Sequence, residues 1–203
     1  SYELFPTESP ENYKEMLKDL KKRGLNKVLL FVTDGLRGIK EKLEEASPKA
    51  KYQTCWTHII RNVLLKVRSK DKAEISEDLK AVYQASTKDE AETNLALFID
   101  KYKEKYPKVT NSLLDVRDCL FTYYLFPKSI RRSIYTTNII ENYNKHLKKG
   151  IKKKEQFPNE QSLNRYVCVS ACEYNVRYAD ISHYGFSIAK EELENMIEEI
   201  YIN

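Results

Sequence analysis

Several residue types and patterns are scarce in this chain of 203 residues, and each scarcity excludes a class of protein. There are five glycines and neither a GxGxxG nor a GxxxxGK[ST] pattern, which excludes the usual dinucleotide and P-loop nucleotide sites. Four cysteines are too few for a disulfide scaffold and favour free thiols, as in a cytoplasmic protein. No apolar run reaches the roughly 18 residues of a membrane-spanning helix, and the first residues do not have the pattern of a signal peptide.

Positive charge, in contrast, is concentrated in one stretch. Residues 128–154 contain nine Lys or Arg and one acidic residue, Glu141, and so carry a net charge of +8. The remainder, with 26 basic and 29 acidic residues, carries −3. A basic block on a slightly acidic body is typical of a surface that binds a polyanion, although a solvated helix face gives the same pattern.

In the first quarter of the chain, the sequence predicts one helix followed by a strand, a helix and a second strand. Ser9-Pro10 caps a first helix that Gly24 ends. The apolar run 27–33 predicts a strand buried on both faces, and 50–54 predicts a shorter strand after an intervening helix. This order is a βαβ unit, so an α/β core begins the chain.

From Trp56 onward the apolar periodicity is helical. Thr87 with Glu90 forms a capping box that opens one of these helices, and 119–126 is apolar enough to be either a buried helix or a strand. Further helices are predicted near 138–150 and 159–178, with an acidic amphipathic one near 188–200. We predict four segments: a βαβ core over 1–55, an all-helical insertion over 56–126, a return to the core over 127–180 and a C-terminal helix over 181–203.

Two candidate sites follow the strands. Asp34 comes directly after the first strand, where open α/β sheets bind ligands, although an Asp-Gly turn alone explains it. Cys55-x-x-His58 follows the second strand and is half of a zinc site. Cys168 and Cys172 lie one helical turn apart and are able to complete that site, but core positions for both are the more economical interpretation.

Glu141 stands within the basic block. Asn138-x-x-Glu141 fits a simple helix cap, with Asn138 at the N-cap position. A carboxylate is nevertheless a poor neighbour for a DNA phosphate unless a divalent cation lies between them, as in metal-dependent phosphodiester chemistry. We therefore predict Asp34 and Glu141 as two metal ligands, with basic side chains along the DNA backbone. These are Arg131, Arg132, Lys145, Lys148, Lys149, Lys152, Lys153 and Lys154.

Helical geometry supports this prediction. At about 100° per residue, one face carries Glu141 with a row of lysines and another carries apolar side chains. The first set is Glu141, Lys145, Lys148 and Lys152, and the second is Ile140, Tyr143, Leu147 and Ile151.

Two longer stretches carry a family resemblance. Residues 32–63 contain D-G-x-x-G followed by P-x-x-x-x-Q-x-C-x-x-H-x-x-R-N, and residues 126–160 contain T-T-N-x-I-E-x-x-N. In both, the chain resembles the Mutator-type family of bacterial insertion-sequence transposases, and the similarity covers nearly its whole length. The resemblance implies the DDE class, with an RNase H-like fold interrupted by an all-helical insertion. The expected fold is therefore α/β: a partial RNase H-like fold with C-terminal helices.

The resemblance also implies roles for single residues. Asp34 matches the family's second catalytic Asp and Glu141 its catalytic Glu, while Cys55 and His58 match a C-x-x-H motif near the active site. Arg61 and Asn62 fit the same motif as supports. The implied cofactor is Mg²⁺ or Mn²⁺, and the implied reaction is in-line attack of water or a 3′-hydroxyl on a DNA phosphodiester. Insertion-sequence ends and target DNA are the implied partners of a homodimer, in the bacterial cytoplasm and associated with the nucleoid.

One departure limits the expected activity. The family's first catalytic Asp lies on the first strand of the fold, several tens of residues before the position that matches Ser1. We therefore expect the C-terminal part of a catalytic domain, inactive alone, with an unpaired sheet edge that invites association.

Three other functions fit the sequence less fully. A non-catalytic DNA-binding protein derived from a transposase would keep the basic helix without the chemistry. A helical protein-interaction module would use 56–126 and the acidic last helix, and a zinc-dependent hydrolase would use Cys55 and His58.

Overall fold

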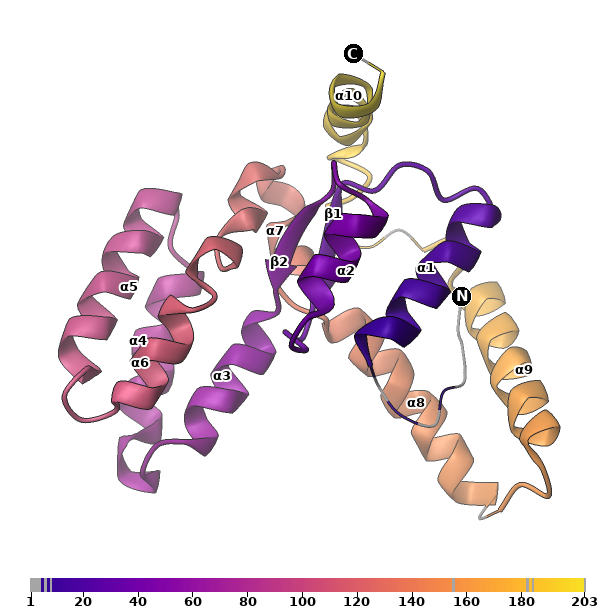
Figure 1. The fold of residues 1–203 in the computed structure, drawn as a ribbon, viewed down its shortest axis with the longest axis horizontal. Coiled ribbons are helices and arrows are strands. Elements are labelled where there is room, and N and C mark those ends of the chain that lie inside the picture. The colour runs from indigo at the N-terminus through magenta and orange to yellow at the C-terminus, as the bar shows by residue number, and fades with distance from the viewer. Residues whose placement is uncertain are drawn as a thin grey trace.

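The computed structural model describes residues 5, 7, 9–154, 156–181, 183 and 185–202. It is mostly helical around one short parallel sheet, which is compatible with the predicted α/β class (Figure 1). In chain order, with η marking a 3-10 turn, the elements are α1 (Pro10–Lys22), β1 (Leu30–Thr33), α2 (Ile39–Ala46), β2 (Lys51–Thr54), α3 (Trp56–Leu65), η1 (Ser69–Asp71), α4 (Lys72–Tyr83), α5 (Lys88–Tyr102), α6 (Pro107–Leu114), η2 (Arg117–Cys119), η3 (Thr122–Leu125), α7 (Lys128–Ile134), α8 (Asn138–Lys154), α9 (Glu160–Tyr178) and α10 (Lys190–Tyr201).

The predicted βαβ unit is confirmed. β1 and β2 pair in parallel, with Leu30 opposite Lys51 and Thr33 opposite Thr54, and α2 connects them. Helices α1 and α2 lie side by side in front of the sheet and share a small core with it (Figure 1). A second small core joins the sheet to α7 and α10, and the Tyr201 hydroxyl of α10 donates a 2.7 Å hydrogen bond to the Val28 carbonyl.

The expected full burial of the first strand is wrong. All four residues of β1 are half-buried, and the strand begins at Leu30 rather than at residue 27. Within the described part of the chain β1 pairs with β2 alone, and an apolar cavity of about 650 Å³ lies along it, lined from α1, β1, α2, α7 and α10. The strand is only half-buried because this cavity leaves part of its apolar surface uncovered.

Local capping signals correctly predict two helix starts. The Ser9 side chain accepts a hydrogen bond from the Asn12 backbone N–H, and Pro10 takes the first position of α1. Thr87 caps α5 in the same way by accepting from the Glu90 N–H. The Glu90 carboxylate in turn accepts from the Ser86 N–H at 2.8 Å, one residue earlier than the usual capping box.

Helices α3 to α6 form a helical lobe, at the left of Figure 1, with its own apolar core. Trp56 is fully buried in this core and contacts the rings of Tyr83 and Phe121. The segment 119–126 is neither of the predicted alternatives: it contains the last residue of η2 and the whole of η3, joined and followed by irregular backbone. The proposed boundaries of the lobe at residues 56 and 126 stay a prediction.

The 3-10 segment is held by polar side chains of the second strand and α3. The buried Gln53 amide donates to the Leu120 carbonyl at 2.9 Å and accepts from the Tyr123 N–H at 3.0 Å. The Trp56 indole N–H donates to the same Leu120 carbonyl at 2.9 Å. These contacts satisfy backbone groups that a continuous helix would have paired internally and that a strand would have paired with a neighbouring strand.

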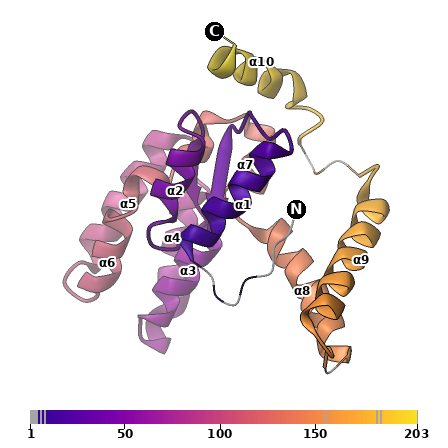
Figure 2. The same cartoon turned by 45° about the vertical axis from the view of Figure 1, so that its right-hand side comes forward.

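Helices α8 and α9 form a hairpin that projects from the body (Figure 2). Gly150 lets them approach closely, because a Cβ built there would lie 1.8 Å from the Tyr166 hydroxyl oxygen. Much of the surface of α9 faces solvent, because Val167 is the one buried residue of this helix. Cys168 and Cys172 are exposed on it, which corrects the expectation that both are core residues.

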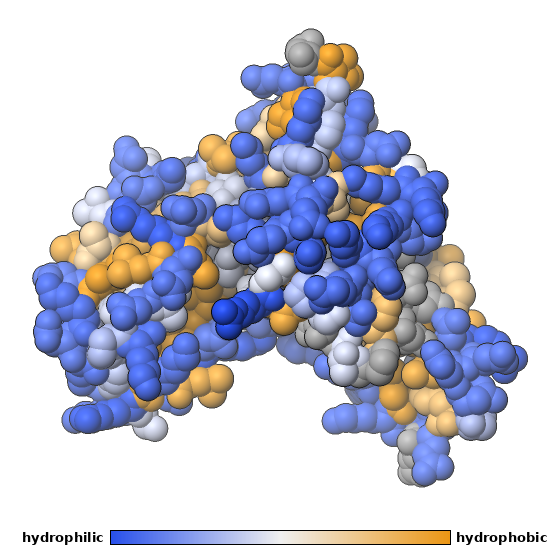
Figure 3. Space-filling model, viewed as in Figure 1, coloured by the Kyte–Doolittle hydropathy of each residue, from blue (hydrophilic) through white to orange (hydrophobic). Residues whose placement is uncertain are grey.

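Hydrophilic side chains dominate the face shown in Figure 3, with apolar patches over the helical lobe at the left and near the hairpin at the lower right. Among the described residues, no helix is both long and apolar enough to cross a membrane. Residues 1–4 and 203, the ends of the first and last predicted segments, lie outside the described residues.

Candidate active site

The start of α3 is tied to the start of α8. Cys55 is fully buried at the N-cap of α3, and its Sγ accepts a hydrogen bond from the Thr137 N–H at 3.2 Å. The Trp56 N–H donates to the Tyr135 carbonyl at 2.9 Å. One side-chain and one main-chain acceptor thereby join two segments about 80 residues apart, which fixes where α8 leaves the body.

Glu141 lies on the first turns of α8 and faces α3. Its two carboxylate oxygens accept hydrogen bonds from the two terminal nitrogens of Arg61, at 2.9 and 3.0 Å. His58 Nε2 lies 3.4 Å from Glu141 Oε1. Asn138 is already the first residue of α8, and the Glu141 N–H bonds to the Thr137 carbonyl. A cap centred on Asn138 is therefore wrong, and the Glu141 side chain is turned towards α3 instead.

Asp34 reaches the same place from the sheet. It follows β1 directly, is exposed, and lines one pocket of about 570 Å³ together with Glu141. We call this the carboxylate pocket. Its lining residues come from α1, β1, α2, α3 and α8: Tyr13, Val32, Thr33, Asp34, Ile39, His58, Arg61, Thr137, Ile140, Glu141, Asn144, Lys145 and Lys148. The fold thus brings together two carboxylates that are 107 positions apart in the sequence.

Arg61 lowers the pKa of Glu141. The hydrogen bonds from this guanidinium lower the pKa of the Glu141 carboxyl, and the charges of Arg61, His58 and Lys145 act in the same direction against partial burial. The Glu141 side chain is 17% exposed and that of Arg61 is 51% exposed, so the pair lies at the mouth of the pocket. The Glu141 carboxylate is therefore ionised at neutral pH.

The pair makes a testable prediction about pH. Glu141 has a lowered pKa in the folded chain, so its contribution to stability is present above the ordinary value of 4.5 and is lost as pH falls through the lowered value. We expect Arg61→Leu to move the pKa of Glu141 up towards its ordinary value, as followed by NMR titration of the carboxyl carbon. Arg61→Lys keeps the charge and should give a smaller rise. An unchanged pKa in Arg61→Leu would contradict the assignment.

The carboxylate pocket fits part of a divalent metal site. Its Asp34 and Glu141 oxygens are the donor type that Mg²⁺ and Mn²⁺ prefer. Across the described residues, no group of three or more His, Cys, Asp or Glu side chains gathers in a way that would hold a metal ion. The two carboxylates thus supply a partial ligand set. Nor, in this part of the chain, do Cys55, His58, Cys168 and Cys172 come together as a zinc cluster.

The basic side chains divide into three groups. Lys145 and Lys148 line the carboxylate pocket, whereas Arg131 is half-buried and donates to the carbonyls of Phe126 and Tyr124 at 2.9 and 3.0 Å. The others are exposed: Arg132, Lys149, Lys152, Lys153 and Lys154. A DNA contact by Arg131 stays a prediction, because its guanidinium already has these structural partners.

Two of the contacts that build the site are not foreseen from the sequence. In the sequence Thr137 is only one residue of a motif, yet in the structure its N–H donates a hydrogen bond to Cys55. Arg61 is expected only as a support, although it is the main hydrogen-bond partner of Glu141. Ile140 is expected on the apolar face but is 61% exposed beside Glu141. The sequence signal that indicates the role of Arg61 is its spacing from His58, because residues three apart lie on one face of a helix.

Comparisons with known proteins agree on a family. A family model described as "Transposase, Mutator family" matches residues 1–179. The chain is 40% identical over 197 residues to the transposase for insertion sequence element IS905 of Lactococcus lactis subsp. lactis (strain IL1403), a match that covers 97% of this chain and 50% of that relative. It is 38% identical over 173 residues to the transposase for insertion sequence element IS1201 of Lactobacillus helveticus, covering 85% and 47%. The chain spans about half the length of these curated relatives. It belongs to the Mutator family of transposases.

Proposed function

We propose that this chain is the Asp34- and Glu141-bearing part of a metal-dependent DNA transposase. In this proposal β1, α2 and β2 are part of an RNase H-like catalytic core, and the complete protein cleaves DNA at insertion-sequence ends and joins them to a target. The observation that carries the proposal is the shared pocket of the two carboxylates beside exposed lysines, in a chain that belongs to a transposase family.

Each group in the carboxylate pocket has a distinct task in this proposal. Asp34 and Glu141 hold Mg²⁺ or Mn²⁺, which when bound stabilises the negative charge of the attacked phosphodiester. Arg61 orients the Glu141 carboxylate through both oxygens, and His58 borders it. Cys55 acts on the chemistry only indirectly, by fixing the start of α8 through Thr137. The lysines of α8 bind the DNA backbone.

Two carboxylates make an incomplete set for this chemistry. We infer that a further acidic ligand comes from sequence outside this chain, which spans half of its relatives, and that the chain alone does not cleave DNA. A homodimer fits the need to handle two insertion-sequence ends together. A non-catalytic DNA-binding role is the second candidate, favoured by the two hydrogen bonds from Arg61 that engage both oxygens of Glu141.

Binding of DNA by α8 is tested by charge removal. The triple variant Lys148→Gln, Lys149→Gln, Lys152→Gln should weaken binding of a DNA duplex and make it less dependent on salt. The salt slope should fall by about one for each phosphate that the lysines no longer neutralise. The measurement is fluorescence anisotropy of a labelled duplex over a series of salt concentrations.

A matched control variant has the same net charge as the triple variant of α8. Lys66, Lys70 and Lys108 are exposed on the helical lobe, and their change to Gln removes three positive charges away from α8. This control should bind with a nearly unchanged salt slope. Equal weakening by both triple variants would mean that net charge, and not the face of α8, determines binding, and that result would overturn the proposed interface.

A further inference from the structure

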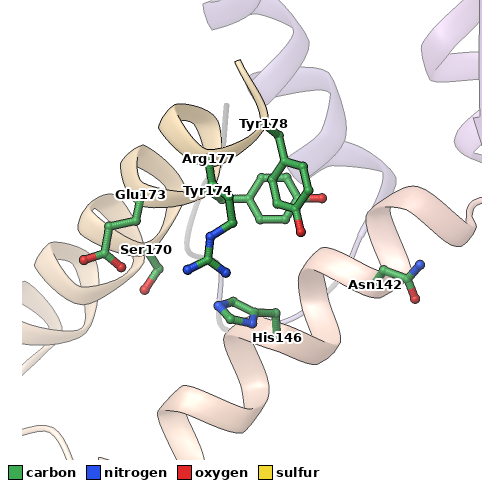
Figure 4. Close-up of a pocket in the computed structure, with 7 residues that line it drawn as sticks. All are labelled: Asn142, His146, Ser170, Glu173, Tyr174, Arg177 and Tyr178. Carbon is green, nitrogen blue, oxygen red and sulfur yellow. The ribbon is translucent and has the colours of Figure 1, made fainter. Parts of the chain in front are cut away.

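A second pocket lies between α8 and α9, on a different face of α8 from the carboxylate pocket. It has a volume of about 390 Å³. His146 enters it from α8, and Tyr174, Arg177 and Tyr178 enter it from α9, as Figure 4 shows. The four side chains come from successive turns of two packed helices, so the pocket is part of the hairpin itself and does not depend on a loop.

One wall of this pocket is an aromatic stack. The rings of Tyr174 and Tyr178 lie with centroids 4.4 Å apart and an interplanar angle of 38°. Tyr174 also makes a T-shaped contact with Tyr143, with ring centroids 5.0 Å apart. Tyr143 and Tyr174 are half-buried, whereas Tyr178 is exposed at the end of the stack. The stack is therefore anchored in the hairpin and ends in a ring that is accessible to a further flat group.

The other wall attracts anions. The Arg177 guanidinium points across the pocket towards the imidazole of His146 (Figure 4). Within the described part of the chain, neither Arg177 nor His146 has a side-chain hydrogen bond or ion pair. Lys149 is exposed three residues after His146, on the same side of α8. Glu173 is the one acidic residue among the pocket's described lining, and it is outnumbered only when Lys149 is counted together with Arg177.

We propose that this pocket binds one unpaired nucleotide of the DNA strand handled by the transposase. Tyr178 stacks on the base, while Arg177 and His146 contact the adjacent phosphate. The inference rests on the proposed function, because it takes the ligand of α8 to be DNA. It adds a binding site for a single-stranded end to the backbone contacts of the lysine row.

Geometry favours an unpaired nucleotide over a duplex. A base inside a duplex is stacked on both faces and has no free face for Tyr178, whereas a base beyond the end of the paired region has one. The volume of the pocket is near the lower end of the range for small-molecule sites, which suits one nucleotide and excludes a duplex.

The experiment compares two DNA ends on the intact chain. One probe is a blunt duplex, and the other is the same duplex with a short single-stranded tail, both labelled at the far end for fluorescence anisotropy. The unmodified chain should bind the tailed probe about tenfold more tightly. Tyr178→Ala should remove most of that preference, roughly five- to tenfold, and leave binding of the blunt duplex unchanged. Tyr178→Phe keeps the ring and should keep the preference.

Controls separate this inference from the proposed function. Val176→Ala changes an 80%-exposed side chain on the same helix outside the pocket and should have no effect. Circular dichroism checks that each variant folds. Equal affinity of the unmodified chain for both probes, or an unchanged preference in Tyr178→Ala, would overturn this inference alone. Absence of binding to either DNA would overturn the proposed DNA function and this site with it.

Discussion

Glu141→Gln and Asp34→Asn should each abolish DNA cleavage in a full-length transposase that contains this chain. Both changes remove a negative oxygen from the carboxylate pocket while keeping the size of the side chain. If the two carboxylates hold the metal, each loss removes several kcal/mol of transition-state stabilisation, and the rate should fall by about a thousandfold or more. Cleavage of a labelled insertion-sequence end in the presence of Mg²⁺ or Mn²⁺ measures this effect.

Binding must be measured beside cleavage. DNA affinity should stay within about threefold of the unmodified protein, because in the proposed interface the lysine row and not the carboxylates contacts the backbone. Glu92→Gln on α5 is a suitable control, since it removes an acidic side chain of the helical lobe and should leave cleavage unchanged. Retained cleavage in either pocket variant would refute the assignment of that carboxylate, and the non-catalytic DNA-binding role would then be favoured.

The sequence predicts those parts of the fold that depend on interactions between residues close together in the chain. Ser9 with Pro10 and Thr87 with Glu90 mark two helix starts because a cap involves only neighbouring residues. The apolar run before Asp34 and the short segment 50–54 before Cys55 predict the two parallel strands. By contrast, 119–126 is equally apolar, but its conformation depends on Gln53 and Trp56, which lie about 65 residues earlier.

In the candidate site, too, the features set by neighbouring residues are predictable from the sequence, and those set by distant contacts are not. That Asp34 follows a strand and Glu141 begins a basic helix is visible in the sequence, but their shared pocket depends on how α8 leaves the body. That exit is set by the contact of Cys55 with Thr137, across 82 positions, which no helical or strand periodicity encodes. The bidentate contact of Arg61 with Glu141 is likewise a result of packing between distant helices. Pairwise tertiary contacts of this kind cannot be predicted from the periodicity of one sequence.

Trp56→Ala should cause the largest loss of stability in the chain, about 3–5 kcal/mol in the free energy of unfolding. Trp56 is fully buried, contacts the rings of Tyr83 and Phe121, and donates its indole N–H to the Leu120 carbonyl. Its removal leaves a cavity in the helical lobe and takes one donor from that carbonyl. Because Trp56 is also the chain's single tryptophan, unfolding in urea is best followed by circular dichroism and not by intrinsic fluorescence.

Two further variants show whether this loss reflects packing at Trp56 or a general weakness of α3. Leu65→Ala alters an 80%-exposed side chain at the other end of the same helix and should change stability by less than about 0.5 kcal/mol. Trp56→Phe keeps part of the packing but loses the hydrogen bond, so an intermediate loss is expected, and this variant stays informative if Trp56→Ala is too unstable to purify. A loss in Leu65→Ala equal to that in Trp56→Phe would contradict the argument. Helix α3 also carries His58 and Arg61, which line the carboxylate pocket. If Trp56 gives the largest loss of stability of these variants, the packing of Trp56 in the helical lobe is what holds α3, and with it these two side chains, in place.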